Sequence, residues 1–248
     1  MYNPFSLKGK TILVTGASSG IGKATAIECS KLGATLVITG RNIQRLEDTF
    51  KQLEGHNHLL IPVDLNKEDG IDFLLKELPL LNGIVHSAGL PNNTPFQFAT
   101  REKLDEVMNV NFYAPLEITR RVLKEKKITN GGSIVFISSI SGVFTSAIAL
   151  TIYSASKGAI NGMIKGLALD LASKGIRVNS VNPGIVETTI FDAGVITSEQ
   201  LDEEKKLYPL KRFGRPIEVA HASIYLLSDA SNWVTGSNLL IDGGFTLL

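Results

Sequence analysis

The chain alternates short apolar runs with longer segments in which apolar positions recur every three or four residues. The short runs are rich in β-branched residues and are apolar almost throughout, which is typical of strands buried on both faces of a parallel sheet. They predict strands over residues 11–15, 35–39, 59–63, 83–86, 133–138, 177–181 and 239–241. The longer segments predict helices over residues 20–32, 43–54, 68–78, 100–127, 153–173 and 216–228.

This alternation predicts an α/β fold. Parallel strands joined by helices form right-handed crossovers, which leave helices on both faces of the sheet. We therefore expect a Rossmann-type, doubly wound sheet of seven parallel strands. The 248 residues suit a single domain over residues 1–248. Two stretches, 89–99 and 184–212, interrupt the pattern; we expect 184–212 to form a substrate-binding loop or lid, the alternative being an insertion without function.

Composition and charge narrow the class of protein. Hydrophobic residues make up 44% of the chain, enough for a sizeable core, and 25 basic residues face 24 acidic ones. This near-neutral balance argues against a nucleic-acid partner. No apolar segment suits a signal peptide or a membrane span, so a cytoplasmic location is expected. Cys29, the single cysteine, excludes an intrachain disulfide and predicts a small buried thiol, and the four histidines lack metal-ligand spacing.

A glycine-rich turn joins the first predicted strand to the first predicted helix. Glycines let the backbone approach a pyrophosphate, and the following helix N-terminus offers free N–H groups and a partial positive charge. The position between strand and helix therefore predicts a dinucleotide site, the alternative being a tight turn without a ligand. The expected contacts of this turn are Gly16, Ser18, Ser19, Gly20, Ile21 and Gly22.

The end of the second strand predicts which dinucleotide binds. Residues 39–42 contain no carboxylate for a ribose 2′-hydroxyl, whereas Arg41, followed by Asn42, offers a planar cation suited to a 2′-phosphate. We expect NADP(H) in preference to NAD(H); the alternative is that Arg41 is a solvated loop charge. Asp64, followed by Leu65, ends the third strand and would either accept from the adenine amino group or cap the next helix.

Tyr153 and Lys157 stand four positions apart at the start of a long predicted helix, so their side chains lie on one face. A free tyrosine has a pKa near 10, and bringing it to neutral pH requires about three pKa units, or roughly 4 kcal/mol. A nearby ammonium and a charged nicotinamide supply a shift of that order. Tyr153 is therefore the candidate general acid for carbonyl reduction, or base for alcohol oxidation.

Two further polar residues suit the same site. Ser139 ends the fifth predicted strand, where a hydroxyl faces the ligand crevice and can bind a developing negative charge. Asn111 lies inside the predicted helix 100–127, although asparagine is a poor helix former, which indicates a specific polar partner such as a water bridging toward Lys157. The alternatives are a polar strand end and a helix kink.

These motifs together resemble the short-chain dehydrogenase/reductase family, in its branch of about 250 residues, over nearly the whole chain. Residues 15–22 match its TGxxxGIG turn, and Asp64 matches its adenine-contacting aspartate. Residues 182–184 with Thr188 match its PGxxxT segment, and residues 214–216, 234–236 and 242–244 match its C-terminal region. The catalytic tetrad of the family is matched by Asn111, Ser139, Tyr153 and Lys157.

The resemblance implies a role for each matched residue. Tyr153 is the proton donor, Lys157 lowers its pKa and holds the cofactor ribose, Ser139 positions the carbonyl, and Asn111 holds a proton-relay water. The nicotinamide amide and the pyrophosphate are contacted by the segment containing Pro183, Gly184, Val186 and Thr188.

One departure concerns the end of the fourth strand. The family usually has Asn-Asn-Ala-Gly, whereas this chain has His86, Ser87, Ala88 and Gly89. The small pair Ala88 and Gly89 still lets the backbone approach the cofactor. We expect His86 to be a packed, hydrogen-bonded substitute.

The substrate is expected to be a small carbonyl compound or alcohol, with a thioester as the alternative. The candidate pocket walls are 90–98, 141–150 and 184–212, which supply mainly apolar side chains: Pro91, Phe96, Val143, Phe144, Ile148, Phe191, Val195, Ile196, Leu207 and Tyr208. Polar contacts in these walls would come from Asn92, Asn93 and Glu187. Lys124, Lys126 and Lys127 would either attract an acidic carrier protein or complement a helix C-terminus.

The resemblance implies a homo-oligomer, a dimer or a tetramer. Small residues on the helix from Tyr153 would let this face meet a second copy; packing within the chain is the alternative. They are Ala155, Ala159, Gly162 and Gly166. The leading functional hypothesis is an NADP(H)-dependent carbonyl reductase or alcohol dehydrogenase. The alternatives are a 3-oxoacyl-carrier reductase, a non-catalytic dinucleotide-binding protein, and an epimerase of the extended branch, for which the C-terminal part leaves little room.

Overall fold

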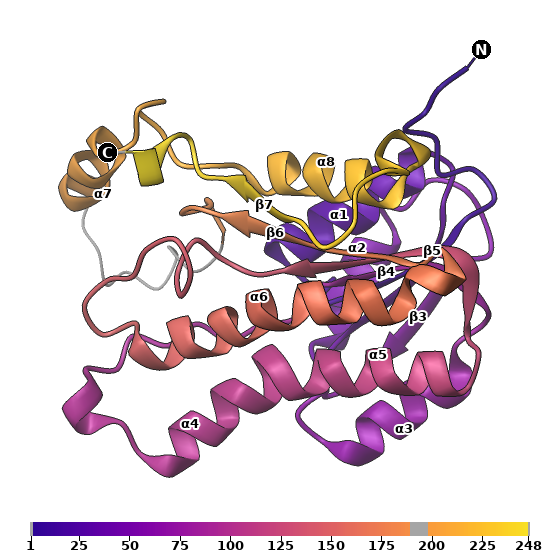
Figure 1. Ribbon diagram of the computed structural model, residues 1–248, viewed down its shortest axis with the longest axis horizontal. Helices are drawn as coiled ribbons and strands as arrows, with labels where there is room; N and C mark the ends of the chain where they lie inside the picture. The colour runs from indigo at the N-terminus through magenta and orange to yellow at the C-terminus, as the bar shows by residue number, and fades with distance from the viewer. Residues whose placement is uncertain (1, 189–197, 248) are drawn as a thin grey trace.

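The sheet lies at the centre of the computed structural model, which describes residues 2–188 and 198–247 (Figure 1). Seven parallel strands follow the order β3-β2-β1-β4-β5-β6-β7. The predicted Rossmann-type fold is confirmed. The strands are β1 Thr11–Thr15, β2 Thr35–Gly40, β3 Leu59–Pro62, β4 Leu81–His86, β5 Ile128–Ile137, β6 Arg177–Pro183 and β7 Asn238–Ile241. The order reverses between β1 and β4, so a crevice opens at their carboxyl ends.

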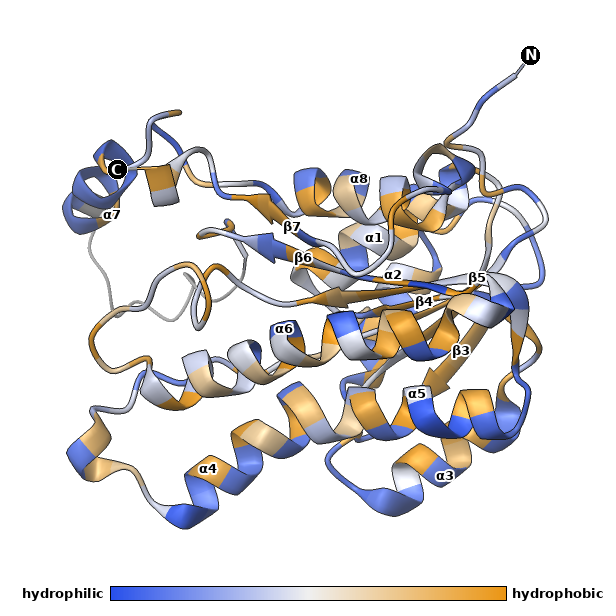
Figure 2. Ribbon diagram, in the orientation of Figure 1, coloured by the Kyte–Doolittle hydropathy of each residue, from blue (hydrophilic) through white to orange (hydrophobic). Residues whose placement is uncertain are grey.

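Helices cover both faces of this sheet. In the view of Figure 1, α1, α2 and α8 lie above the sheet and α3, α4, α5 and α6 below it. Their bounds are α1 Gly20–Lys31, α2 Ile43–Phe50, α3 Glu68–Glu77, α4 Arg101–Met108, α5 Ala114–Lys124, α6 Thr151–Leu171, α7 Ser198–Lys206 and α8 Pro216–Leu227. Figure 2 shows strands that are largely apolar and helices whose polar residues gather on the outer surface.

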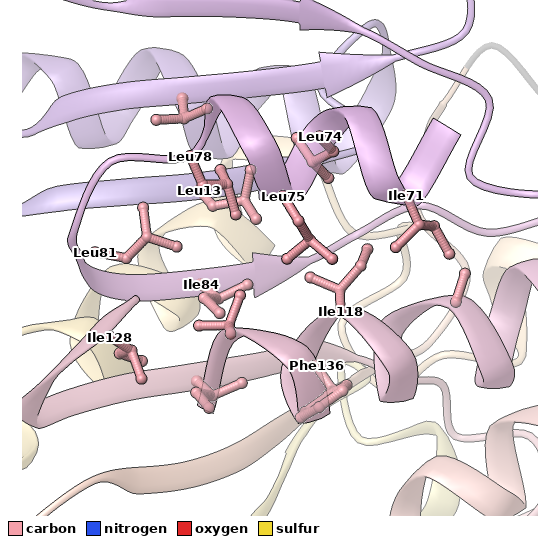
Figure 3. Packing of buried hydrophobic residues seen from close by; sticks show 14 of the residues in the cluster. Leu13, Ile71, Leu74, Leu75, Leu78, Leu81, Ile84, Ile118, Ile128 and Phe136 are labelled. Carbon is pink, nitrogen blue, oxygen red and sulfur yellow. The ribbon is translucent and has the colours of Figure 1, made fainter. Parts of the chain in front are cut away.

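Two apolar cores form because the central strands, unlike the edge strands β3 and β7, are buried on both faces. One core packs α3, α5 and α6 against the sheet, and Figure 3 shows part of it, with Leu75 of α3 pointing toward Ile118 of α5. The other core joins α1, α2 and α8 to the opposite face and contains Cys29, which is buried as predicted. None of the helices in the described residues is both long enough and apolar enough to cross a membrane.

The largest differences from the expected elements lie in three stretches of the chain. The helix expected over 100–127 is divided into α4, a π-helical turn η2 at Asn109–Tyr113, and α5, which ends at Lys124. Strand β5 begins at Ile128, and its pairing with β4 shifts register between Leu81 and Gly83. The stretch 184–212 was expected to be irregular but contains α7, a polar helix whose short pattern carries little periodic signal.

Candidate active site

A cleft of about 570 Å³ runs across the carboxyl ends of the central strands. It brings together every residue expected to bind the dinucleotide: Gly16, Ser18, Ser19, Gly20, Ile21, Gly22, Arg41, Asn42, Asp64, Leu65, Ala88, Gly89, Tyr153, Lys157, Pro183, Gly184, Val186 and Thr188. Ser139 also lines this cleft, whereas Asn111 is buried beside it. Local motifs far apart in the sequence therefore converge on one site.

The glycine turn after β1 has no room for a side chain at Gly16 or at Gly22. A Cβ atom at Gly16, where φ is +67°, would lie 2.7 Å from Ala88 Cα, and one at Gly22 would lie 2.3 Å from Gly16 O. Thr15 Oγ1 accepts from the backbone N–H of Ala88 at 3.2 Å, which ties the end of β1 to the end of β4. Ser19 precedes α1 and its side chain makes no capping hydrogen bond, so the start of α1 suits an anionic group.

At the other end of the cleft, two arginines follow β2. Arg41 is exposed, and Arg45 lines the cleft one turn further on, in α2. Arg45 was not predicted from the sequence, although its i,i+4 spacing from Arg41 could have indicated it. Asn42 Oδ1 accepts from Arg45 N at 2.9 Å and so caps α2. A Cβ at Gly40 would lie 3.2 Å from Ser18 Oγ, so a side chain there would crowd the turn.

Asp64 closes a local turn after β3. Its Oδ1 accepts from Asn66 N at 3.0 Å. Helix α3 begins at Glu68 with Lys67 as its N-cap residue, so the helix-capping alternative for Asp64 is wrong. The carboxylate lines the cleft instead.

Tyr153 and Lys157 lie in the first turns of α6, with Lys157 Nζ 5.7 Å from the centroid of the Tyr153 ring. Lys157 is buried and donates to Ile137 O, at the end of β5, at 2.9 Å. Ser139 lies two residues beyond β5 rather than at its end, and its Oγ accepts from Ser141 N at 3.1 Å. The hydroxyl proton of Ser139 can therefore be donated, and Tyr153 is a hydrogen-bond partner of Ser139.

Burial dominates the ionisation of both groups on α6. It raises the pKa of Tyr153, and a hydrogen bond with Ser139 lowers that pKa in part. Burial also lowers the pKa of Lys157 to about 8. Among the described side chains, Ser139 rather than Lys157 opposes the effect of burial on the pKa of Tyr153. The expected effect of Lys157 on Tyr153 stays a prediction.

Asn111 lies in the π-helical turn, and its side chain forms hydrogen bonds with the backbone of Leu90, the residue after Gly89. Its Oδ1 accepts from Leu90 N at 2.7 Å, and its Nδ2 donates to Leu90 O and to Ser156 Oγ, both at 3.0 Å. A Cβ at Gly89 would lie 3.4 Å from Asn111 Oδ1 and 3.6 Å from Lys157 Nζ. The expected polar partner of Asn111 is thus a backbone segment at the rim of the cleft, and the relay water stays a prediction.

His86, at the end of β4, is packed and hydrogen-bonded as expected. Its Nε2 lies 2.9 Å from Thr119 Oγ1, which donates its own proton to Pro115 O at 2.8 Å. Nε2 therefore carries the imidazole proton, and Nδ1 is a buried acceptor that finds no hydrogen-bond partner among the described residues. The ring stacks on Phe136 with centroids 4.7 Å apart, and burial lowers the pKa of His86 to about 3.

The side chains expected to form the substrate walls lie in different environments. Pro91 lines the cleft, and five other apolar side chains of these walls are exposed to solvent: Phe96, Val143, Phe144, Ile148 and Leu207. Tyr208 was expected to face the substrate, but it is buried behind the loop that follows β6, where its hydroxyl accepts from Ile185 N. Phe191, Val195 and Ile196 lie outside the described residues.

Two other expectations concern the basic residues near the end of α5 and the metal-ligating side chains. Lys127 donates to Leu78 O at 3.0 Å and to Leu75 O, so it caps the C-terminus of α3 rather than its own helix. Within residues 2–188 and 198–247, no three His, Cys, Asp or Glu side chains are grouped so that they could hold a metal ion.

The fold and the cleft define an α/β protein of the dinucleotide-binding type, with Tyr153 and the buried Lys157 lining the cleft. A family model described as enoyl-(acyl carrier protein) reductase matches residues 16–246. The chain is 34% identical to the 3-oxoacyl-(acyl-carrier-protein) reductase FabG of Thermotoga maritima, over 97% of this chain and 99% of the relative. It is 35% identical to the glucose 1-dehydrogenase of Gluconobacter oxydans, over 96% and 92%. The chain belongs to the short-chain dehydrogenase/reductase family, oxidoreductases that act on CH–OH groups with a nicotinamide cofactor.

A solved structure gives the same picture of the fold. The angucycline C-6 ketoreductase LanV with bound NADP superposes with a TM-score of 0.87 at 28% identity, covering 98% of both chains.

Proposed function

We propose that this protein is an NADP(H)-dependent oxidoreductase that transfers hydride between nicotinamide and a carbonyl or secondary alcohol, with Tyr153 as the general acid or base. The observation that supports this most directly is the convergence of Tyr153, Ser139 and Lys157 in the cleft that begins at the glycine turn. The nicotinamide, when bound, supplies or accepts the hydride. The side chains of the protein bind the substrate oxygen and move its proton.

Each side chain has a geometric reason for its proposed part. Ser139 already accepts from Ser141 N, so its hydroxyl proton can be donated to the substrate oxygen, where negative charge develops during reduction. Tyr153 gives its proton to the same oxygen, or takes it back during oxidation. Lys157 donates one hydrogen bond to Ile137 O, and an ammonium has two further N–H groups with which to hold a ribose.

The preference for NADP(H) rests on the charge at the end of β2. Arg41 and Arg45 both line the cleft there, and residues 39–42 carry no carboxylate that would favour a free ribose 2′-hydroxyl. The NADP bound to LanV is consistent with this preference. We also propose a cytoplasmic location, in which Cys29 stays reduced.

A 3-oxoacyl thioester is the second candidate substrate, because the Thermotoga maritima relative carries the name of such a reductase. The basic residues near the end of α5 support it less than expected, since Lys127 is engaged in capping α3. The name of the Gluconobacter oxydans relative favours a sugar instead. Residues 184–212, with α7, remain the proposed substrate lid.

The test is a screen of NADPH oxidation over ketones, 3-oxoacyl thioesters and sugars, run in parallel on wild type and Tyr153→Phe. We expect wild type to reduce members of one class and the variant to lose turnover by about 10²-fold or more, because general acid catalysis is worth that much. Cofactor affinity, followed by NADPH fluorescence, should stay within a few-fold. Undiminished turnover by Tyr153→Phe would refute the assignment of the acid, and wild type that binds NADPH but reduces nothing would favour a non-catalytic role.

A further inference from the structure

The segment joining α7 to α8, residues 207–215, packs against the loop that follows β6, residues 184–188, which we name the β6 loop. Gly214 N donates to Ile185 O at 2.9 Å, and Glu187 N donates to Gly214 O at 2.8 Å. The β6 loop carries the residues proposed to contact the nicotinamide end of the cofactor. Its shape is therefore set in part by a segment that is distant from β6 in sequence.

Tyr208, in this segment, contacts the β6 loop through its side chain. It is 2% exposed, and its hydroxyl accepts from Ile185 N at 2.9 Å. Its ring packs edge-on against Phe213, with centroids 5.6 Å apart, and lies 4.8 Å from the ring of Phe245. A Cβ at Gly184 would lie 3.2 Å from Tyr208 Cε1, so ring and loop are in direct contact.

The hydroxyl of Tyr208 differs from the other groups that hold the β6 loop. Gly184 N donates to Ile241 O at 3.2 Å and Glu187 N to Gly214 O, so both of those acceptors are backbone carbonyls. The acceptor for Ile185 N is a side chain, and of these three bonds it alone depends on residue identity. Burial raises the pKa of Tyr208, which keeps this acceptor a neutral phenol at neutral pH.

The same residue continues the last turn of α7. Tyr208 N donates to Lys205 O at 3.1 Å, and Leu207 N donates to Glu204 O at 3.1 Å. In Figure 1, α7 lies beyond the carboxyl ends of β6 and β7, beside the C-terminus. The ring of Tyr208 is thus attached to α7 through the backbone and to the β6 loop through its hydroxyl.

We infer that Tyr208 is a positioning residue: its hydroxyl fixes the β6 loop in the shape that receives the nicotinamide end of the cofactor, and its backbone links that loop to α7. The inference rests on the proposed function, because it takes the β6 loop to be part of the cofactor site. Tyr208 touches neither substrate nor cofactor and acts through Ile185 and Gly184.

The test compares Tyr208→Phe with wild type and with Tyr225→Phe, which removes a hydroxyl from α8 outside the cleft. Phenylalanine keeps the ring contacts but leaves Ile185 N without its acceptor. We expect the Kd for NADPH to rise about tenfold in Tyr208→Phe, as for the loss of one buried hydrogen bond of about 1.4 kcal/mol. The kcat at saturating cofactor should stay within twofold, the Ile185 amide should exchange faster with solvent, and Tyr225→Phe should match wild type.

A purely structural role would lower the melting temperature of Tyr208→Phe without changing the Kd for NADPH, and that result would overturn the inference. Unchanged exchange of the Ile185 amide would overturn it as well, by a measurement that needs no cofactor. If wild type itself binds neither NADPH nor NADH, the proposed function fails, and this is seen before any variant is compared.

Discussion

At the scale of single residues, His86 shows how burial sets a protonation state. Its ring is held as the Nε2–H tautomer by Thr119, and its Nδ1 faces a buried environment without a donor. Burial lowers the pKa of His86 in the folded state to about 3, from its ordinary value of 6.5. Between these two values the unfolded chain binds a proton that the folded chain does not, so stability falls as the pH drops.

We therefore predict that His86→Asn makes the protein less sensitive to acid. In wild type, the free energy of unfolding should lose about 2 kcal/mol through His86 between pH 7 and pH 5, and more as the pH falls further toward 3. Urea unfolding at several pH values measures this, with His56→Asn, at an exposed loop position, as the control. Parallel pH profiles for wild type and His86→Asn would contradict the prediction.

We expect Arg41 to determine the preference for NADPH over NADH. Arg41→Ala should weaken NADPH binding by about 10- to 100-fold, the usual worth of a hydrogen-bonded charge pair, and NADH binding by less than threefold. Fluorescence titrations with both cofactors measure this, and Arg120→Ala, an exposed arginine on α5, is the matched control. Equal losses for the two cofactors would remove the argument for a 2′-phosphate contact.

At the scale of elements, the turn after β5 fits tightly against α6. A Cβ at Gly142 would lie 2.3 Å from Ser154 O and 2.8 Å from Gly158 N, and φ at Gly142 is +106°. The turn joins Ser139 to the helix that carries Tyr153 and Lys157. Its contact with α6 thus helps to set the distance from Ser139 to the two side chains that are proposed to act with it.

Gly142→Ala should destabilise the protein by about 2–4 kcal/mol and reduce turnover at least tenfold, because turn and helix must move apart. Gly131→Ala is the matched control: φ there is +77°, but an added Cβ would meet nothing within 4 Å. The control should lose only about 1 kcal/mol, from the left-handed backbone alone, and keep its activity. The free energy of unfolding, measured by chemical denaturation, and the initial rate of turnover are compared between the two variants. Equal effects of the two substitutions would show that the contact with α6 contributes to neither quantity.

At the scale of the whole molecule, α6 presents an open face of small residues. Ala155, Gly162 and Gly166 are exposed, and an added Cβ at either glycine meets nothing within 4 Å in the described residues. Packing against a neighbouring helix of the same chain is therefore wrong as an explanation of these two glycines. We propose that a second copy covers this face, in a dimer or a tetramer.

Gly162→Trp should dissociate such an assembly, because a large side chain would separate helices that approach through glycine. Light scattering after size-exclusion chromatography measures the mass, and Lys76→Trp, at an exposed position of α3, is the control. We expect wild type and the control to be oligomeric and Gly162→Trp to be smaller. A wild-type protein that is monomeric at micromolar concentration would refute the proposal that a second copy covers this face of α6.

The strands and the glycine turn were predictable from the chain alone, since their signals are local. A strand buried on both faces needs an apolar run, and a tight turn at Gly16 needs glycine. The poor helix propensity of Asn111 likewise predicted a polar partner, although not that the partner is Leu90. The cleft residues could be named because parallel strands end at one edge of a sheet.

What only the tertiary structure decided is which side chains meet across the fold. Tyr208 looks in sequence like an apolar loop residue near the substrate, yet it is buried against Ile185, and Lys127 caps α3 instead of its own helix. Such contacts join residues far apart in the chain and depend on packing and on the need to satisfy buried polar groups. The sequence by itself determined the order of elements and the chemistry available at the cleft. The packing of the sheet, its helices and their loops decided the partner of each side chain.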